Sequence, residues 1–196
     1  MDNQIRALLG HNIGDVLSLS DIQAQMMFNV ATIDMNIEEI RYYEEPEGLF
    51  KYTGYIVTAP DDVKYMLLIR EIGELADTML MFLDQENDIS VYIDAGLLTN
   101  NRQDFIDTFP CETPEGESFN WIRKRPSIFG VNTTVITDDH ETDQKTLIEY
   151  TADVETKNSD ALLEWSGNEE SGWLEVWYGC QVKPYEIKIL EVVDDD

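Results

Sequence analysis

The sequence predicts a mainly β (α+β) fold, an antiparallel sandwich or barrel-like sheet of many short strands with one or two short helices. Three observations support this prediction. Apolar and polar residues alternate in short runs along the chain, turn sequences such as Glu45-Pro46-Glu47-Gly48 and Ala59-Pro60-Asp61-Asp62 separate the runs, and residues 160–178 read as a hairpin. Because the connections are short, antiparallel order is expected.

The N-terminal elements are expected in the following order. Residues 4–9 are weakly helical, and residues 15–19 alternate like a short strand. Ser20 or Asp21 then either caps a short helix through Met26 or begins an extended segment. Further strands are predicted over residues 28–34, 37–43, 49–58, 63–72, 78–83 and 89–93.

The middle of the chain changes character. Residues 99–109 carry apolar side chains at helical spacing and are followed by Pro110, which predicts a short amphipathic helix. A strand is expected over residues 118–122, and residues 126–144 are expected to be a loop with a brief strand near 131–136. Strands resume over residues 146–156, and a last one is predicted over 186–190.

The hairpin of residues 160–178 is the clearest structural signal. Its second strand places Leu174, Val176 and Tyr178 on one face, and it places Trp173, Glu175 and Trp177 on the other. Both faces are therefore substantially apolar, so the second must be covered by this chain, a partner or a ligand. We take Trp173, Trp177, Glu175 and, from the first strand, Trp165 as candidate interaction residues; the alternative is ordinary core packing.

The length of 196 residues suits a single β-rich domain over residues 1–196. A faint internal echo is also present, since Tyr52-Thr53 with Thr58 and Asp62 recurs as Tyr150-Thr151 with Thr156 and Asp160. This predicts two similar halves, about 27–95 and 116–190, joined by the helical segment 99–109. The alternative is an accident of β-rich composition.

Charge is the most unusual bulk property of the chain. There are 13 Lys and Arg residues against 40 Asp and Glu residues, which gives a formal net charge of -27. Direct binding to nucleic acid through a basic face is therefore not expected, nor is binding to anionic membranes. The excess of carboxylates serves solubility, steers a basic partner, or imitates the phosphates of DNA.

The sequence contains no recognisable motif for catalysis, metal binding or export. Cys111 and Cys180 lie far apart in no metal-binding pattern, and His11 and His140 have no second histidine at a useful spacing. We therefore predict no enzyme activity, no cofactor and no metal. Without an apolar run of membrane-spanning length or a signal peptide, no membrane insertion is expected and the predicted location is the cytoplasm.

The one basic cluster of the sequence is Arg123-Lys124-Arg125. It has two interpretations. In the first, the cluster contacts an acidic group, either on a partner or on a second copy of the chain. In the second, it is the solvated end of a strand.

The order of these features resembles the YjfK-like family of uncharacterised bacterial proteins. The resemblance is carried by Thr32-Ile33-Asp34, Arg41-Tyr42-Tyr43 and Gly48-Leu49-Phe50, and later by Ile148-Glu149-Tyr150, Leu162-Leu163-Glu164-Trp165 and Pro184-Tyr185-Glu186-Ile187. It implies a cytoplasmic accessory protein that acts with a membrane-stress or membrane-remodelling partner, and it carries over no catalytic residue.

Three functional hypotheses follow from the sequence. The first is a non-enzymatic interaction protein that binds a protein partner, in particular a basic one, or associates with itself as a homo-oligomer. The second is a DNA mimic that inhibits a nucleic-acid-binding protein, which requires carboxylates spaced like duplex phosphates. The third is a hydrolase or metal-dependent enzyme with an unfamiliar arrangement of residues.

Overall fold

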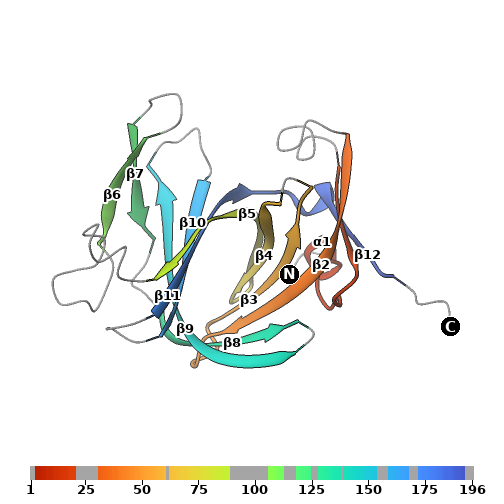
Figure 1. The fold of residues 1–196 in the computed structure, drawn as a ribbon, viewed down its shortest axis with the longest axis horizontal. Helices are drawn as coiled ribbons and strands as arrows, with labels where there is room; N and C mark the ends of the chain where they lie inside the picture. The colour runs from red at the N-terminus through yellow and green to blue at the C-terminus, as the bar shows by residue number, and fades with distance from the viewer. Residues whose placement is uncertain are drawn as a thin grey trace. The chain divides into compact units, whose positions relative to one another are not determined.

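The computed structural model describes residues 3–20, 31–60, 62–88, 106–112, 118–124, 128–137, 139–153, 159–167 and 172–192. These residues form mainly antiparallel β structure (Figure 1), which confirms the predicted fold class. The elements are α1 (Asn3–Arg6), β1 (Val16–Ser20), β2 (Thr32–Glu44), β3 (Phe50–Thr58), β4 (Lys64–Ile72), β5 (Leu75–Asp88), β6 (Thr108–Glu112), β7 (Ser118–Arg123), β8 (Ile128–Ile136), β9 (His140–Ala152), β10 (Ser159–Gly167), β11 (Gly172–Gln181), the 3-10 turn η1 (Pro184–Glu186) and β12 (Ile187–Leu190).

The chain forms two compact units made of interleaved segments. The first comprises Met1–Phe82, Asn132–Thr142 and Gln181–Asp196, and the second comprises Leu83–Val131 and Asp143–Cys180. Strands β5, β8 and β9 each begin in one unit and end in the other. The predicted pair of similar halves concerns a sequence repeat rather than compactness, and it stays a prediction.

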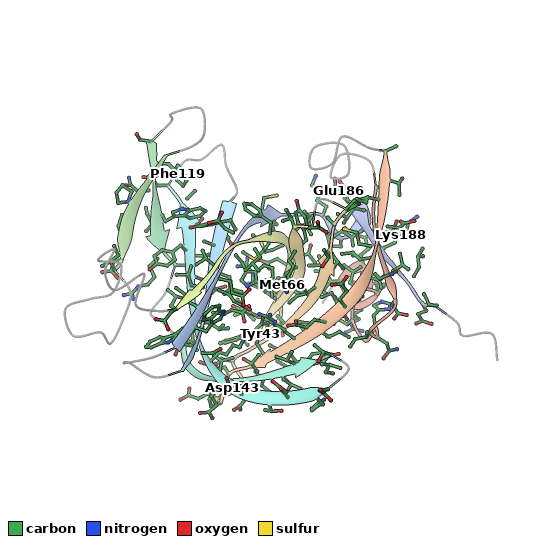
Figure 2. The ribbon with its side chains drawn as sticks, in the orientation of Figure 1. Tyr43, Met66, Phe119, Asp143, Glu186 and Lys188 are labelled. Atoms are coloured by element: carbon green, nitrogen blue, oxygen red, sulfur yellow. The ribbon has the colours of Figure 1, made fainter. Side chains whose placement is uncertain are left out.

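In the first unit the strand order is β12-β1-β2-β3-β4-β5, and the end of β8 also pairs with β2. Strand β4 is buried on both faces from Tyr65 to Arg70, which explains the unbroken apolar run that its sequence shows. On one of these faces the Tyr43 hydroxyl donates to Met66 Sδ over 3.9 Å, and both side chains are labelled in Figure 2.

Two buried arginines also belong to the first unit. Arg70 donates from Nε and Nη2 to the two carboxylate oxygens of Asp77, with both distances 2.7 Å. Arg41 pairs with Glu39 two residues earlier on β2, next to the register shift that lies between Ile37 and Glu39. A guanidinium can be buried in this way only because a carboxylate compensates its lost hydration.

In the second unit the order is β5-β11-β10-β9-β7-β6, where β5 contributes its residues from Leu83 onward. The predicted hairpin is confirmed: β10 and β11 are antiparallel, with Leu163 opposite Val176 and Trp165 opposite Leu174. One face of this sheet is a core cluster of Trp121, Ile148, Tyr150, Ala161, Leu163, Trp165, Leu174 and Val176. Tyr178 stacks on Trp121 with ring centroids 5.2 Å apart, and Phe119, labelled in Figure 2, meets Trp121 edge-on.

The middle of the chain differs from the prediction. Thr108–Glu112 is strand β6 rather than the end of a helix over 99–109, because Phe109 pairs with Trp121 of β7. Pro110 is tolerated there since β6 ends the sheet order and needs hydrogen bonds on one side only. Residues 99–105 lie outside the described part of the chain, as do residues 21–26 and the predicted strand over 89–93.

Residues 126–144 are also corrected. In place of a loop with a brief strand, β8 runs over Ile128–Ile136 and β9 already begins at His140. The first five residues of β9 are all exposed, so their polar sequence lacks the apolar alternation by which a strand is recognised. Two further strands were predicted separately, over 28–34 and 37–43. In the described part of the chain they form the single strand β2, which has a register shift between Ile37 and Glu39.

Gly172 offers a test of the hairpin packing. A Cβ atom at this position would lie 2.5 Å from both the Ser166 carbonyl oxygen and Trp165 Nε1. Gly172→Ala is therefore expected to destabilise the protein by about 1–3 kcal/mol, because the backbone carbonyl cannot move aside freely. Denaturant unfolding followed by circular dichroism measures this change.

Gly54→Ala is the matched control for that substitution. It also adds a Cβ within a strand, but the nearest atom, at 2.7 Å, is the flexible thioether sulfur of Met66. We expect a loss smaller than that caused by Gly172→Ala. Equal stability of Gly172→Ala and the unchanged protein would contradict the packing described at the hairpin end.

Candidate protein interaction site

Of the three tryptophans predicted to interact, Trp173 is the one that the structure leaves accessible. It is the second residue of β11, opposite Ser166 of β10, and 46% of it is exposed. Its indole N–H donates to Glu86 Oε1 over 2.8 Å. The hydrogen bond fixes the orientation of the ring and leaves apolar surface open to a partner.

Glu86 belongs to a row of exposed carboxylates on β5. Asp84, Glu86 and Asp88 are all exposed, and alternation along the strand places them on the same face. We call these three residues the acidic ridge. Its middle member holds Trp173, so the second unit presents an aromatic side chain beside a line of negative charge.

Trp177, Glu175 and Trp165 have a different position. Trp177 has no exposed surface. Its indole N–H donates a long hydrogen bond to Glu175 Oε2, with 3.4 Å between Nε1 and Oε2. Trp165 is buried in the core cluster. A partner would therefore reach neither Trp165 nor Trp177 without rearrangement, and the predicted interaction role narrows to Trp173, with Glu175 half-buried next to it on the same face.

The face that carries Trp177 also contains buried charge. Lys145 Nζ lies 3.1 Å from Glu164 Oε2, and both side chains are buried. The register of β9, β10 and β11 places Leu147, Leu162 and Glu149 on this same face. Lys145 is thus committed to an internal carboxylate and does not neutralise the acidic ridge.

The predicted basic cluster is likewise paired within the second unit. Arg123 donates to Asp107 Oδ1, and Lys124 Nζ lies 2.7 Å from Asp160 Oδ2. Arg125 lies outside the described residues. Both described members are thus bound to carboxylates of the same chain, which favours the interpretation as a strand end over that as a contact for an acidic partner.

The two histidines, which the sequence offers as candidate catalytic groups, have different surroundings. His140 is exposed at the start of β9, whereas His11 is buried in the first unit with Nε2 3.0 Å from the carbonyl oxygen of Ala7. Because that nitrogen is already engaged, it is not placed to take a proton from a nucleophile. Within the described ranges, no three His, Cys, Asp or Glu side chains come together as metal ligands.

A helix that spans a membrane has to be both long and apolar. None of the helices in the described part of the chain is long and apolar enough to cross a membrane.

Sequence reasoning found Trp173 but not its partner. Glu86 is 87 residues away along the chain. The spacing of Asp84, Glu86 and Asp88 is that of calcium ligands, but Ile89 and Ala95 stand where a calcium loop has glycine and glutamate. The same alternation of carboxylates is the pattern of an exposed strand face. Nothing in the sequence shows that this strand lies beside β11.

The buried ion pair can be tested by substitution. Lys145→Met is expected to destabilise the protein by about 3 kcal/mol, because Glu164 remains buried without this partner. Lys124→Met, which removes the more exposed pair with Asp160, is expected to cost less than about 1 kcal/mol. Denaturant unfolding at constant salt compares the two, and equal losses would contradict the assigned difference in burial.

Comparisons of the chain with protein-family models, curated proteins and solved structures give no match. The resemblance to the YjfK-like family, carried by motifs such as Arg41-Tyr42-Tyr43, therefore stays a prediction. A functional proposal for this chain accordingly depends on the chemistry of its own residues, above all Trp173 and the acidic ridge.

Proposed function

We propose that the chain is a non-enzymatic cytoplasmic interaction protein whose second unit binds a basic segment of a protein partner. The observation that carries the proposal is the half-exposed Trp173, held by Glu86 within a row of exposed carboxylates. An aromatic ring face attracts Lys and Arg side chains, and adjacent carboxylates add to that attraction.

The chemistry of the site favours a cationic partner. A ring whose N–H donates to a carboxylate presents its face and edge to other groups, and the face is the part that attracts a cation. The formal net charge of -27 adds long-range attraction for basic molecules and repulsion for nucleic acid. Binding driven in this way is fast and weakens as salt is added.

The spacing of the ridge favours an extended segment. Residues on one face of a strand recur about every 6.7 Å, so Asp84, Glu86 and Asp88 repeat at this interval. Alternate side chains of an extended peptide repeat at the same interval. A segment with Lys or Arg at every second position therefore matches the ridge, and one of its cations can lie against the Trp173 ring.

A peptide titration tests the proposal. An eight-residue peptide that alternates Lys and Ser is added at low salt, and Trp fluorescence or calorimetry reports binding. Trp173→Ala is expected to weaken binding about two- to fivefold, since the cation–π contribution of an exposed ring is about 0.5–1 kcal/mol. Glu86→Gln is expected to weaken it severalfold, because a ridge charge and the acceptor for Trp173 change together.

Glu141→Gln is the matched control. Glu141 is exposed and belongs to the first unit rather than to the ridge, so this variant changes the net charge by the same amount and leaves the three ridge carboxylates unchanged. We expect it to bind the peptide nearly as the unchanged protein does. If Glu86→Gln and Glu141→Gln weaken binding equally and Trp173→Ala has no effect, the attraction reflects net charge alone and the proposed site is wrong.

A further inference from the structure

A buried histidine in the first unit is placed between two hydrogen-bond acceptors. His11 is 9% exposed, with Nε2 3.0 Å from the Ala7 carbonyl oxygen and Nδ1 3.5 Å from Asp15 Oδ2. Its ring meets Tyr55 edge-on, and the Tyr55 hydroxyl accepts weakly from the His11 backbone N–H over 3.4 Å. Among the described residues Nδ1 has no hydrogen-bond partner.

A neutral imidazole cannot satisfy both acceptors. The ring then carries one N–H, so whichever tautomer forms, the other nitrogen directs a lone pair at Ala7 or at Asp15. The imidazolium form has an N–H on each side and can donate to both. Proton uptake by His11 therefore adds a hydrogen bond between the ring and Asp15, assisted by charge on both groups.

Asp15 connects this histidine to the C-terminal part of the chain. Its Oδ2 accepts the Asn12 N–H at 2.8 Å, and its Oδ1 accepts the Val192 N–H at 3.0 Å, just beyond β12. Burial raises the pKa of Asp15, but these two hydrogen bonds and the neighbouring His11 outweigh it, so the pKa lies below its ordinary value. The carboxylate is thus charged across the range in which histidines titrate.

Titratable groups other than Asp15 belong to the elements that pack around His11. From β3, Tyr55 stays neutral, because burial raises its pKa to about 12. Helix α1 ends at Arg6, which is exposed. The carbonyl oxygen of the following residue, Ala7, lies 3.0 Å from His11 Nε2. In η1, which contacts α1, the Glu186 carboxylate accepts the Lys183 N–H. Among the described residues, Asp15 is the carboxylate paired with the ring, with its Oδ2 3.5 Å from His11 Nδ1.

We propose that His11, Asp15 and the Val192 amide form a proton-operated latch that holds the end of β12 more firmly when His11 is protonated. The latch requires an imidazolium and a carboxylate at once. With a neutral imidazole the added hydrogen bond is absent. As the pH falls through the lowered pKa of Asp15, the carboxylate is protonated and the contribution is lost again.

The experiment measures unfolding in denaturant from pH 3.5 to 8.5. The chain has two histidines, so His140→Gln, at an exposed position, is the matched control for His11→Gln. We expect the unfolding equilibrium constant of the unchanged protein, relative to that of His11→Gln, to be about tenfold lower at pH 5.5 than at pH 8. His140→Gln is expected to keep the pH dependence of the unchanged protein.

Asp15→Asn tests the acceptor. This variant should lose stability at pH 5.5 and approach the unchanged protein as the pH falls below about 4, where the carboxylate contribution disappears. The His11 ring signal in NMR should titrate at lower pH in Asp15→Asn than in the unchanged protein, while the His140 signal does not move. This comparison of titration midpoints holds even where a variant is much less stable, provided that it folds under the conditions used.

Hydrogen exchange tests the connection to the C-terminal strand. We expect the Val192 amide of the unchanged protein, corrected for the intrinsic effect of pH, to exchange severalfold more slowly at pH 5.5 than at pH 8, and this difference should vanish in His11→Gln. Retention of the pH effect on stability in His11→Gln would overturn the latch. A Val192 amide protected equally at both pH values would also overturn it, since the histidine would then not act on β12.

Discussion

The second unit depends on the alternation of side chains along β11. Pairing with β10 in a fixed register assigns Leu174 and Val176 to the core cluster, and this choice places Trp173, Glu175 and Trp177 on the opposite face. Along that face the surroundings change from fully buried at Trp177 to half-exposed at Trp173. The candidate interaction site therefore lies where a strand continues beyond its buried part. Its aromatic residue needs a polar partner there, which Glu86 provides.

The scarcity of cations explains why the exposed carboxylates dominate the surface. Only 13 Lys and Arg residues face 40 Asp and Glu residues, and several of the cations are used internally. Arg70 binds Asp77, Arg41 binds Glu39 and Lys145 binds Glu164, each cation being buried. A buried charge has to be paired with an opposite charge. The three cations in these pairs therefore do not offset the exposed carboxylates, and the net charge of the surface stays strongly negative.

The sequence predicted a strand correctly where the pattern of apolar residues matches the faces that the structure buries. The β10–β11 hairpin, β1 and the apolar run of β4 were predictable, because one or both faces pack and the composition shows it. Strand β6 was not, since its apolar spacing imitates a helix and only pairing with β7 decides against it. The start of β9 was missed because it is exposed throughout. At the candidate site, Trp173 could be identified from the alternation of residues in β11. Its hydrogen bond with Glu86 could not, because the two residues are 87 positions apart and meet only in the folded chain.

The two carboxylates that carry the proposals differ in how they respond to solution conditions. Glu86 is exposed and accepts the neutral indole N–H of Trp173, so added salt screens the attraction of the ridge for a basic segment. Asp15 is buried beside a histidine and accepts two backbone N–H groups, so salt screens it little while one proton changes the charge of its neighbour. Salt and protonation therefore separate the two proposals: the proposed binding at the ridge depends on ionic strength, and the proposed hold on β12 depends on the protonation of His11.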